Sequence, residues 1–395
     1  MHVRTWVVLA VWLMAVPVWG AVYYVSPGGS DSAGGSEGAP FRTIAQGVRH
    51  LQSGDTLYLR GGTYDEDLVF SKGEIPNGGG SWATATKIAG YPGEKAIVKP
   101  PPPNGPQFGV LYLGEGGGFN WMIFDNLTLD GTRAQGQVAL LGGDSHHIRI
   151  SNSDLFRLGP NGGETKGGTG IGGGGSYHEF LNNHIHDLGG YGTYWAGNNS
   201  VFDGNEFDNI GGFAVHMYNT GAHNVSNNVV RNNSIHNVGK TYFCGSVLLS
   251  HGTNNQAYNN TIEDNGCGVA VDHACVDCRV ENNTIRNNGS YGVMIGDLYP
   301  TETHGTVVRN NIITGSPTAI YNPHGSQATV EGNTTDGGAA PAGVGAQPGA
   351  GVAGAPAAGP EGPGPEGAGP GGGPGATAPP PRPAPTALFA ASAPS

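Results

Sequence analysis

The hydrophobic and polar positions of this chain repeat a short phrase along its central part. In each copy a polar pair, usually Asn-Asn, stands two residues before an apolar anchor; the six clearest copies occupy 181–185, 203–207, 231–235, 258–262, 281–285 and 309–313. Two weaker copies end at Leu129 and Leu155, and a degenerate copy covers 331–335. The anchors recur at intervals of 22 to 30 residues. An interval of this size indicates a fold built from stacked repeats.

Within one repeat, three short alternating runs are separated by Gly, Asn or Asp. An example is the unit with runs at 292–295, 307–309 and 312–313. No unit shows the long 3.6-residue period of a helical repeat. Three strands per coil, stacked at about 4.8 Å, make a parallel β-helix, so the predicted fold class is all-β. The repeated Asn predicts a ladder of side-chain amides that satisfies backbone groups at each bend.

The segment 41–51 places Phe41, Ile44, Val48 and Leu51 on one helical stripe. A short helix here would cap the N-terminal end of the stack, which is otherwise an open β edge. The run 54–59 is then predicted to be the first strand.

The two ends of the chain differ from the repeat. Residues 1–20 combine a basic start, an apolar run and small residues at 18 and 20, as in a secretory signal peptide. Residues 337–395 are mostly Pro, Gly and Ala, which predicts a disordered tail. The folded domain should therefore span 21–336. No later stretch is apolar enough to cross a membrane, and we expect a secreted, monomeric protein.

Composition narrows the partners. The chain has 72 Gly, 12% charged residues and a net charge of −12. Abundant Gly with few charges fits a β-rich repeat with tight turns. The acidic balance argues against a nucleic acid partner. A polyanionic ligand would need a local basic patch or a bridging cation.

Several N-terminal segments resemble the pectate-lyase-like family of secreted right-handed β-helix proteins. They are Tyr-Tyr-Val-Ser-Pro-Gly-Gly-Ser-Asp at 23–31, Ala-Pro-Phe-Arg-Thr-Ile at 39–44, and the segments 53–64, 87–94 and 121–131. The resemblance covers about 22–335 and implies a right-handed coil. It also implies an extracellular polysaccharide as partner, but the family includes lyases, hydrolases and epimerases. The family's usual closing coils after 333 are missing, and the Pro/Gly/Ala tail follows instead.

Four cysteines in an exported chain predict disulfides. Cys244 and Cys267 precede equivalent strands of successive coils, within bridging reach. Cys275 and Cys278 share one loop and could close a local ring. The alternative is a four-cysteine zinc site.

Candidate functional residues emerge when the first strand of each coil is aligned on its inward apolar pairs. Val215/Met217, Val247/Leu249, Val269/Val271 and Val293/Ile295 then lie in register. The outward columns bring Tyr194, His216, Tyr218, His251, Asp272, His273 and Asp297 to one face. This convergence predicts the functional site.

The chemistry of these residues suits a glycan. Tyr194 and Tyr218 could stack on sugars, and Lys166 could contact a carboxylate. In a lyase, His216, His251 or Lys240 would act as the base, and Ca²⁺ on Asp272 and Asp297 would neutralise the uronate.

The residues of this face also allow two other roles. In a hydrolase, Asp272 and Asp297 would be the acid and the base. His251 and His273 could instead bind a transition metal.

Two hypotheses follow. The first is an enzyme, more specifically a lyase that cleaves a uronate-containing polysaccharide by β-elimination, with a glycoside hydrolase as its runner-up. The second is a non-catalytic glycan-binding or cell-surface protein, which the uncapped C-terminal end and the absence of a complete known catalytic motif favour.

Overall fold

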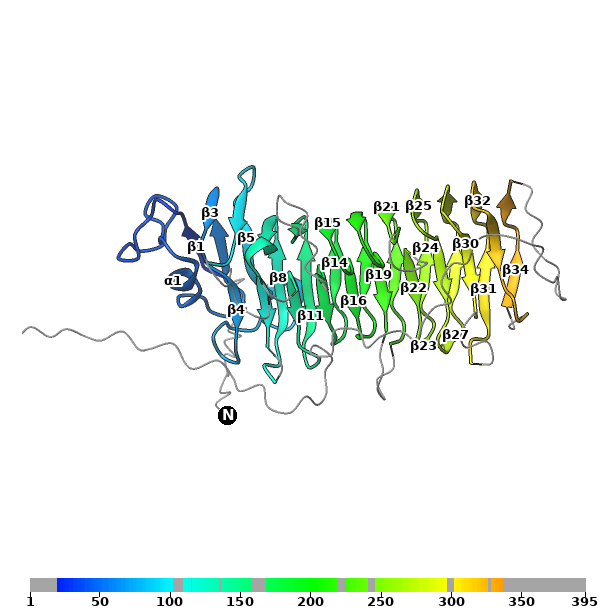
Figure 1. The fold of residues 1–395 in the computed structure, drawn as a ribbon. Helices are drawn as coiled ribbons and strands as arrows, with labels where there is room; N and C mark the ends of the chain where they lie inside the picture. The colour runs from blue at the N-terminus through cyan, green and yellow to red at the C-terminus, as the bar shows by residue number, and fades with distance from the viewer. Residues whose placement is uncertain are drawn as a thin grey trace, which may run out of the picture.

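Three parallel β-sheets wind around one continuous core in the computed structural model (Figure 1). The structure describes residues 20–101, 109–114, 116–134, 137–157, 168–218, 225–240, 246–296, 302–325 and 328–336. The chain passes from a 12-stranded sheet to an 11-stranded sheet and then to a 10-stranded sheet before it returns to the first. One such circuit forms one coil. The predicted all-β parallel β-helix with three strands per coil is confirmed.

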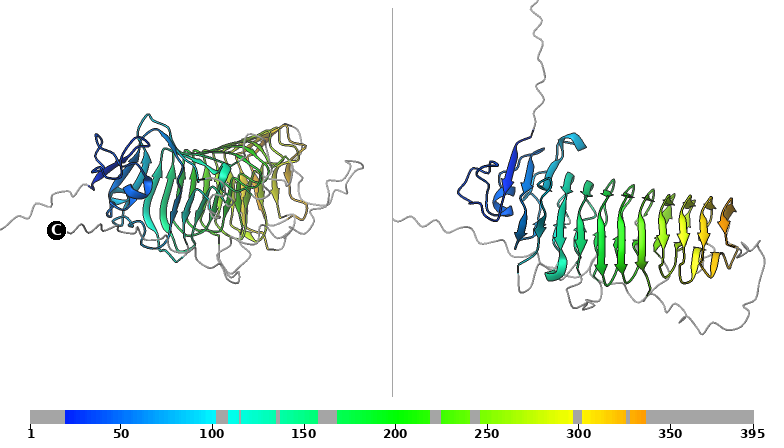
Figure 2. Two further views of the ribbon diagram at one scale, coloured as in Figure 1. Left: turned by 60° about the vertical axis from the view of Figure 1, so that its left-hand side comes forward. Right: turned by 90° about the horizontal axis from the view of Figure 1, so that it is seen from above.

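The strands of each sheet are parallel to one another, lie across the long axis of the molecule and are stacked along it (Figure 2). The 12-stranded sheet contains β1 (Val22–Val25), β2 (Thr56–Leu59), β5 (Thr86–Gly90), β8 (Asn120–Asp125), β11 (His146–Ser151), β14 (Glu179–Leu181), β17 (Val201–Asp203), β20 (Val229–Arg231), β24 (Gln256–Tyr258), β28 (Arg279–Glu281), β31 (Thr306–Arg309) and β34 (Ala328–Glu331). The 11-stranded sheet contains β3 (Gly62–Tyr64), β6 (Ala96–Val98), β9 (Leu127–Asp130), β12 (Asp154–Phe156), β15 (His184–Leu188), β18 (Glu206–Ile210), β21 (Ser234–Val238), β25 (Thr261–Glu263), β29 (Thr284–Arg286), β32 (Ile312–Thr314) and β35 (Thr334–Thr335). The 10-stranded sheet contains β4 (Leu68–Phe70), β7 (Leu111–Leu113), β10 (Ala139–Leu141), β13 (Ile171–Gly173), β16 (Thr193–Trp195), β19 (Val215–Met217), β22 (Val247–Leu249), β26 (Val269–Val271), β30 (Tyr291–Ile295) and β33 (Thr318–Tyr321). A further short pair joins β23 (Gly252–Thr253) to β27 (Cys275–Val276), and two 3₁₀ turns, η1 (Trp82–Thr84) and η2 (Gly131–Arg133), lie between strands.

The apolar anchors of the repeat form one column of the core. Strand pairing aligns Leu129, Leu155, Ile185, Phe207, Ile235, Ile262, Ile285 and Ile313 in this order. All eight are buried. Each coil therefore covers the anchor of its neighbour, which is the packing that a repeat unit cannot achieve alone.

The predicted asparagine ladder is present, and the two residues of each Asn pair have different tasks. The second Asn is buried: Asn260 donates from both its backbone N and its side-chain Nδ2 to Oδ1 of Asn283 in the next coil, at 3.0 and 2.9 Å. The first Asn adopts the left-handed conformation, for example Asn259 with φ of +56°. Asn and Gly tolerate this conformation best, which explains why Gly204 takes the same position in one copy.

The N-terminal cap is shorter than the sequence suggests. Helix α1 covers Ile44–Val48, and the Thr43 side chain accepts a hydrogen bond from the backbone N of Gln46. The predicted stripe is buried against the first coil. The prediction of the first strand was wrong: β1 precedes α1 and pairs with β2, so the run at 54–59 forms the second strand. Because β1 is only four residues long and lies at the edge, its alternating pattern was too short to identify.

The described residues begin at Gly20 and end at Asp336. The predicted signal peptide at 1–20 and the tail at 337–395 therefore lie outside them, apart from Gly20. Within the described part of the chain, no helix has the length and apolar character needed to span a membrane.

Candidate functional site

The predicted column of outward side chains exists on the 10-stranded sheet. Strand pairing aligns Tyr194, His216, Leu248, Ala270, Met294 and Tyr321. The register that the inward Val, Leu, Ile and Met pairs predicted is therefore confirmed.

The middle of this column is not an open surface. Leu248, Ala270 and Met294 are buried together with Phe213 in a second hydrophobic cluster, separate from the core inside the coil. His216 is also buried, with 4% of its surface exposed. The accessible part of the site therefore includes the half-buried Tyr194, Tyr218 and His251.

Aromatic rings surround the His216 imidazole. The ring of Phe213 stacks on it at a centroid distance of 4.7 Å, and the rings of Tyr191 and Tyr218 stack at 5.0 and 5.4 Å. The Tyr194 ring meets it edge-on at 4.9 Å. Neither ring nitrogen of His216 has a hydrogen-bond partner among the described residues. Burial lowers the pKa of His216 to about 3, with His273 and His251 adding to the effect, so the ring is neutral at physiological pH.

His251 follows β22 and lies at the accessible edge of this arrangement. Its ring meets Tyr218 edge-on at 4.6 Å and stacks on His273 at 5.4 Å. Both histidines have positive φ, +51° and +48°, which aims their side chains away from the regular strand direction. We call Tyr191, Tyr194, Phe213, His216, Tyr218, His251, Asp272 and His273 the histidine–tyrosine cluster.

A hydrogen bond to Ser250 fixes the tautomer of His251. The Ser250 hydroxyl donates its proton to the carbonyl oxygen of Met217. Its Oγ therefore accepts from His251, whose Nδ1 lies at 3.0 Å. The proton of the neutral ring is then on Nδ1, and the lone pair is on Nε2. Burial, followed by the charge of His273, lowers the pKa of His251 to about 4.

Asp272 occupies the interior of the cluster. Its side chain is fully buried, and its Oδ1 accepts a hydrogen bond of 2.8 Å from the backbone N of His273. The Nδ1 of His273 lies 3.9 Å from Oδ2. Calcium takes six to eight oxygen ligands. Among the described residues of the cluster, Asp272 offers a single, already engaged carboxylate, which does not fit a calcium site by itself.

The remaining predicted site residues lie elsewhere or outside the described residues. Lys240 is exposed beyond the end of β21, and its Nζ donates to Oδ1 of Asn237 at 3.0 Å. No contact that the described residues make within the cluster involves Lys240. Lys166 and Asp297 lie outside the described part of the chain.

The cysteines agree with disulfides in the described part of the chain. Cys275 and Cys278 form the predicted local bridge, with their Cα atoms 6.0 Å apart. Cys267 is also disulfide-bonded. Cys244, its predicted partner, lies outside the described residues. The alternative of a four-cysteine zinc site is therefore wrong, because three of its four ligands are oxidised.

Sequence reasoning missed three members or supports of the cluster. Tyr191 and Phe213 lie two residues before the first residues of β16 and β19 and three residues before Tyr194 and His216, so the outward alternation of the strands does not locate them. The role of Ser250 depends on the Met217 carbonyl of the preceding coil, which no pattern in the sequence reveals.

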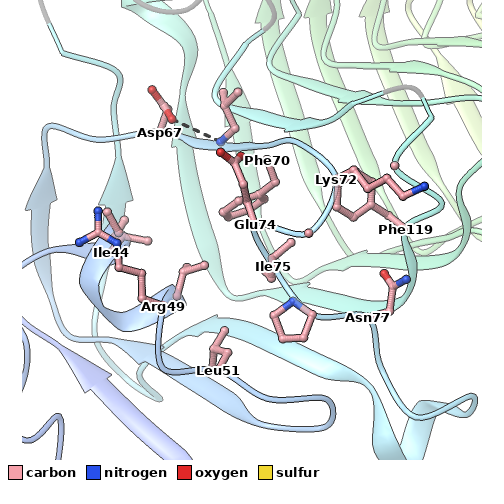
Figure 3. Close-up of a pocket in the computed structure, with 16 residues that line it drawn as sticks. Ile44, Arg49, Leu51, Asp67, Phe70, Lys72, Glu74, Ile75, Asn77 and Phe119 are labelled. Carbon is pink, nitrogen blue, oxygen red and sulfur yellow. Dashed lines mark hydrogen bonds between the residues drawn. The ribbon is translucent and has the colours of Figure 1, made fainter. Parts of the chain in front are cut away.

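The structure also contains a cavity of about 730 Å³ far along the chain from the cluster (Figure 3). It lies between α1 and the loop after β4, where Arg49, Asp67, Lys72 and Glu74 contribute charges around the buried rings of Phe70 and Phe119. None of the predicted site residues lines it. Its lining has no imidazole or tyrosine, so the histidine–tyrosine cluster is the better candidate for chemistry.

Comparisons with known proteins agree with the fold. Residues 169–335 match the family described as the right handed beta helix region. The resemblance to pectate-lyase-like right-handed β-helix proteins is confirmed. A curated relative of this right-handed β-helix, pectate lyase PEL9 from Emericella nidulans, is 38% identical over 92 residues. This stretch covers 22% of each chain, so the similarity extends over about a fifth of the relative.

Solved structures share the architecture at low identity. The lacto-N-biosidase of family GH136 from Eubacterium ramulus superposes with a TM-score of 0.52 and 14% identity, over 80% of this chain and 67% of that chain. Pectate lyase Pel9A has a TM-score of 0.49 and 16% identity, over 80% of this chain and 78% of that chain. At such identities the likeness concerns the fold alone.

Proposed function

We propose that this right-handed β-helix is a secreted lyase that cleaves a uronate-containing extracellular polysaccharide by β-elimination at the histidine–tyrosine cluster. The observation that carries the proposal is the state of His251: a neutral, half-buried imidazole whose proton is held on Nδ1 by Ser250. The partial similarity to a protein named pectate lyase supports the choice of a uronate polymer.

His251 acts as the general base. β-Elimination needs a group that removes the proton on the carbon next to the uronate carboxylate. The lone pair on Nε2 of His251 is available for this step, and the depressed pKa keeps it available down to about pH 4. Its backbone N donates to the His273 carbonyl at 2.8 Å, which ties the loop to the next coil and holds the ring in place.

The tyrosines bind and assist. Sugar rings present C–H faces that pack on aromatic rings, and Tyr194 and Tyr218 are half-buried rings of the cluster. The Tyr218 ring, edge-on to His251, brings a phenol close to the base. We assign to this phenol the proton that the departing oxygen needs.

The elimination moves one proton to His251 and one proton from Tyr218. Nε2 of His251 takes the C5 proton, and the electron pair of that C–H bond forms the C4–C5 double bond. The C4–O bond to the preceding sugar breaks, and the Tyr218 hydroxyl protonates the departing oxygen. The proton on His251 then returns to the phenolate through solvent, which restores both groups.

The predicted Ca²⁺ at Asp272 and Asp297 has no role in this reaction, and its effect is tested by comparing Ca²⁺ with EDTA in the assay. Because Asp272 is buried and engaged with the His273 amide, no step is assigned to a cation. The substrate carboxylate still requires neutralisation, since the described cluster contains no Lys or Arg.

The experiment is an assay of the purified full chain on pectic, alginate and glycosaminoglycan polymers, with a neutral glucan as control, in Ca²⁺ or in EDTA. The proposal expects unsaturated uronate products, seen by their ultraviolet absorbance and by mass, from a uronate polymer alone. New reducing ends without unsaturation would mean a hydrolase and would overturn elimination. Saturable binding without any product would mean a glycan-binding protein and would overturn catalysis.

A further inference from the structure

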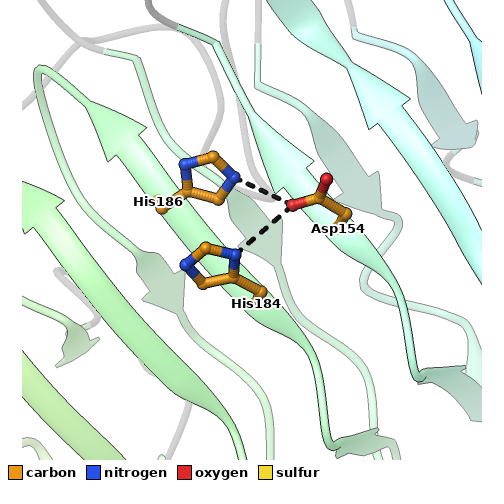
Figure 4. A group of neighbouring side chains, drawn as sticks. All are labelled: Asp154, His184 and His186. Atoms are coloured by element: carbon orange, nitrogen blue, oxygen red, sulfur yellow. Dashed lines mark hydrogen bonds and ion pairs between the residues drawn. The ribbon is translucent and has the colours of Figure 1, made fainter.

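Three potential metal ligands meet on the outer face of the 11-stranded sheet, away from the histidine–tyrosine cluster on the 10-stranded sheet. They are Asp154 on β12 and His184 and His186 on β15 (Figure 4). Strand pairing sets Asp154 directly opposite His184, and alternation along β15 returns His186 to the same face. The arrangement thus follows from the register of two adjacent coils.

The ligand atoms lie at chelating distances. Nε2 of His186 is 2.8 Å and Nδ1 of His184 is 3.6 Å from Oδ1 of Asp154. Two ligand atoms that are each about 2 Å from a tetrahedral ion are about 3.3 Å apart. The two observed distances bracket this value, so small side-chain rotations suffice to admit an ion. Figure 4 shows both imidazole rings turned toward the same carboxylate oxygen.

Supporting contacts hold the central histidine in a metal-binding orientation. Nδ1 of His186 lies 3.0 Å from Oδ2 of Asp187, and Nδ2 of Asn209 donates to Oδ1 of the same carboxylate at 2.6 Å. A carboxylate that accepts the second ring N–H is the usual outer partner of a metal-bound histidine. Phe156 packs its ring on His186 at 5.2 Å and restricts its rotation.

We propose that Asp154, His184 and His186 bind one divalent transition metal ion of the zinc class. Two imidazoles and one carboxylate suit such an ion and not Ca²⁺ or Mg²⁺, which take oxygen ligands. Lys95 lies 3.5 Å from Oδ2 of Asp154, the oxygen that faces away from the histidines, and its side chain is largely exposed. The ion would join β12 to β15 and keep a coordination position toward solvent, because the side chain of His184 is 42% exposed.

A neighbouring histidine on the same sheet provides a matched control. His236 on β21 contacts Glu206 through Nε2 at 3.1 Å and Asp208 through Nδ1 at 3.0 Å. These carboxylates approach opposite nitrogens of one ring, so they cannot converge on a single ion with it. Both groups combine histidine and carboxylate side chains on the same sheet, but only the first brings its ligand atoms together around one point.

The test is calorimetric titration of the tag-free full chain with Zn²⁺, together with the visible spectrum after addition of Co²⁺. We expect one saturable site and cobalt bands of low coordination number. H184A and H186A should each lose both signals, D187A should weaken binding by about 10- to 100-fold, and H236A should bind like the wild type. Circular dichroism and the melting temperature check that each variant is folded. If H186A does not fold, H184Q is measured in its place, because glutamine removes the imidazole ligand and keeps a polar side chain.

Two results would overturn the proposal. The first is the absence of saturable Zn²⁺ binding to the wild type. The second is binding that is unchanged in folded H184A or H184Q, since the ion would then be held by other residues.

Discussion

The Oγ of Ser250 and the Nδ1 of His251 are 3.0 Å apart, and the proton between them belongs to the imidazole. This holds because the serine proton is already donated to the Met217 carbonyl of the preceding coil. The relationship makes the accessible nitrogen of His251 a proton acceptor. It links the stacking of coils to the chemistry that we propose.

Removal of the serine hydroxyl should therefore impair the base without removing it. S250A lets the His251 ring change its tautomer and rotate, and kcat/KM should fall roughly 10- to 100-fold, as for other partners that orient a functional imidazole. The measurement is the initial rate of unsaturated-product formation.

Ser246 supplies the control for that experiment. It is also buried, next to the same sheet, and its Oγ donates to the Cys267 carbonyl at 2.7 Å and not to a histidine. S246A should lose stability similarly and keep its rate per folded molecule. Equal rate losses in both variants would mean that Ser250 has only a structural role.

Substitutions of Tyr194 and Tyr218 should affect different kinetic constants. Y194A removes a stacking surface, and KM should rise about 2- to 10-fold, the equivalent of 0.5–1.5 kcal/mol. Y218F keeps the ring and removes the proposed proton donor, so kcat should fall while KM stays within about twofold. Y321A, at the C-terminal end of the same column, where the ring stacks on Tyr291 at 4.4 Å, should change neither constant. A pure KM effect in Y218F would contradict its role as a donor.

Stability should decrease in mild acid because buried histidines stay neutral in the folded state. The pKa of His216 is lowered to about 3 from an unfolded value of 6.5, so below pH 6.5 the unfolded chain binds a proton that the folded chain refuses. This contribution is fully present above pH 6.5 and is lost as the pH falls toward 3. Each such histidine contributes up to about 1.4 kcal/mol per pH unit to the slope of the unfolding free energy against pH.

H216F tests this assignment, because phenylalanine keeps a planar ring among the aromatic neighbours. Urea denaturation at pH 7, 6 and 5 should give a shallower loss of unfolding free energy for H216F than for the wild type. H324A removes an exposed histidine and should leave the slope unchanged. A slope in H216F equal to that of the wild type would show that His216 titrates normally.

The asparagine ladder should be sensitive at its second position and tolerant at its first. N260A leaves buried partners unsatisfied, including the Asn233 backbone N that donates to Asn260 Oδ1 at 3.0 Å and the Val230 carbonyl. We expect a loss of about 3 kcal/mol in unfolding free energy. N259G should be nearly neutral, because Asn259 is exposed and left-handed, and glycine takes this position in other copies. Similar losses in the two variants would contradict the division of roles.

Much of the fold follows from the sequence because the core is periodic. The eight anchors from Leu129 to Ile313 and the register of the outward column were predictable, since each coil repeats the same inward alternation. The group of Asp154, His184 and His186 also had a signal. Asp154 precedes the anchor Leu155 as His184 precedes the anchor Ile185, and His186 lies on the same face. That signal becomes visible only when the outward positions are also aligned for the strand of each coil that carries the anchor, and not for the first strand alone.

Other features depend on contacts that periodicity does not encode. His216 and Asp272 are buried, and for His216 the ring of Phe213 packs on the imidazole outside the coil. An alignment of outward positions does not show which of them are buried. The bond from Ser250 to the Met217 carbonyl depends on the path of the backbone at the strand end. Asp297, Lys166 and Cys244 lie outside the described residues, so their predicted roles stay predictions.

The turnover of H251Q, compared with the wild type on the uronate polymer that the wild type cleaves best, tests most directly whether His251 is the base. Glutamine keeps polarity and similar length but cannot accept the substrate proton as imidazole does. We predict that kcat falls by about 10²- to 10⁴-fold while polymer binding and the melting temperature are retained. Turnover of H251Q within a few-fold of the wild type would contradict the central claim, because the base would then be another residue.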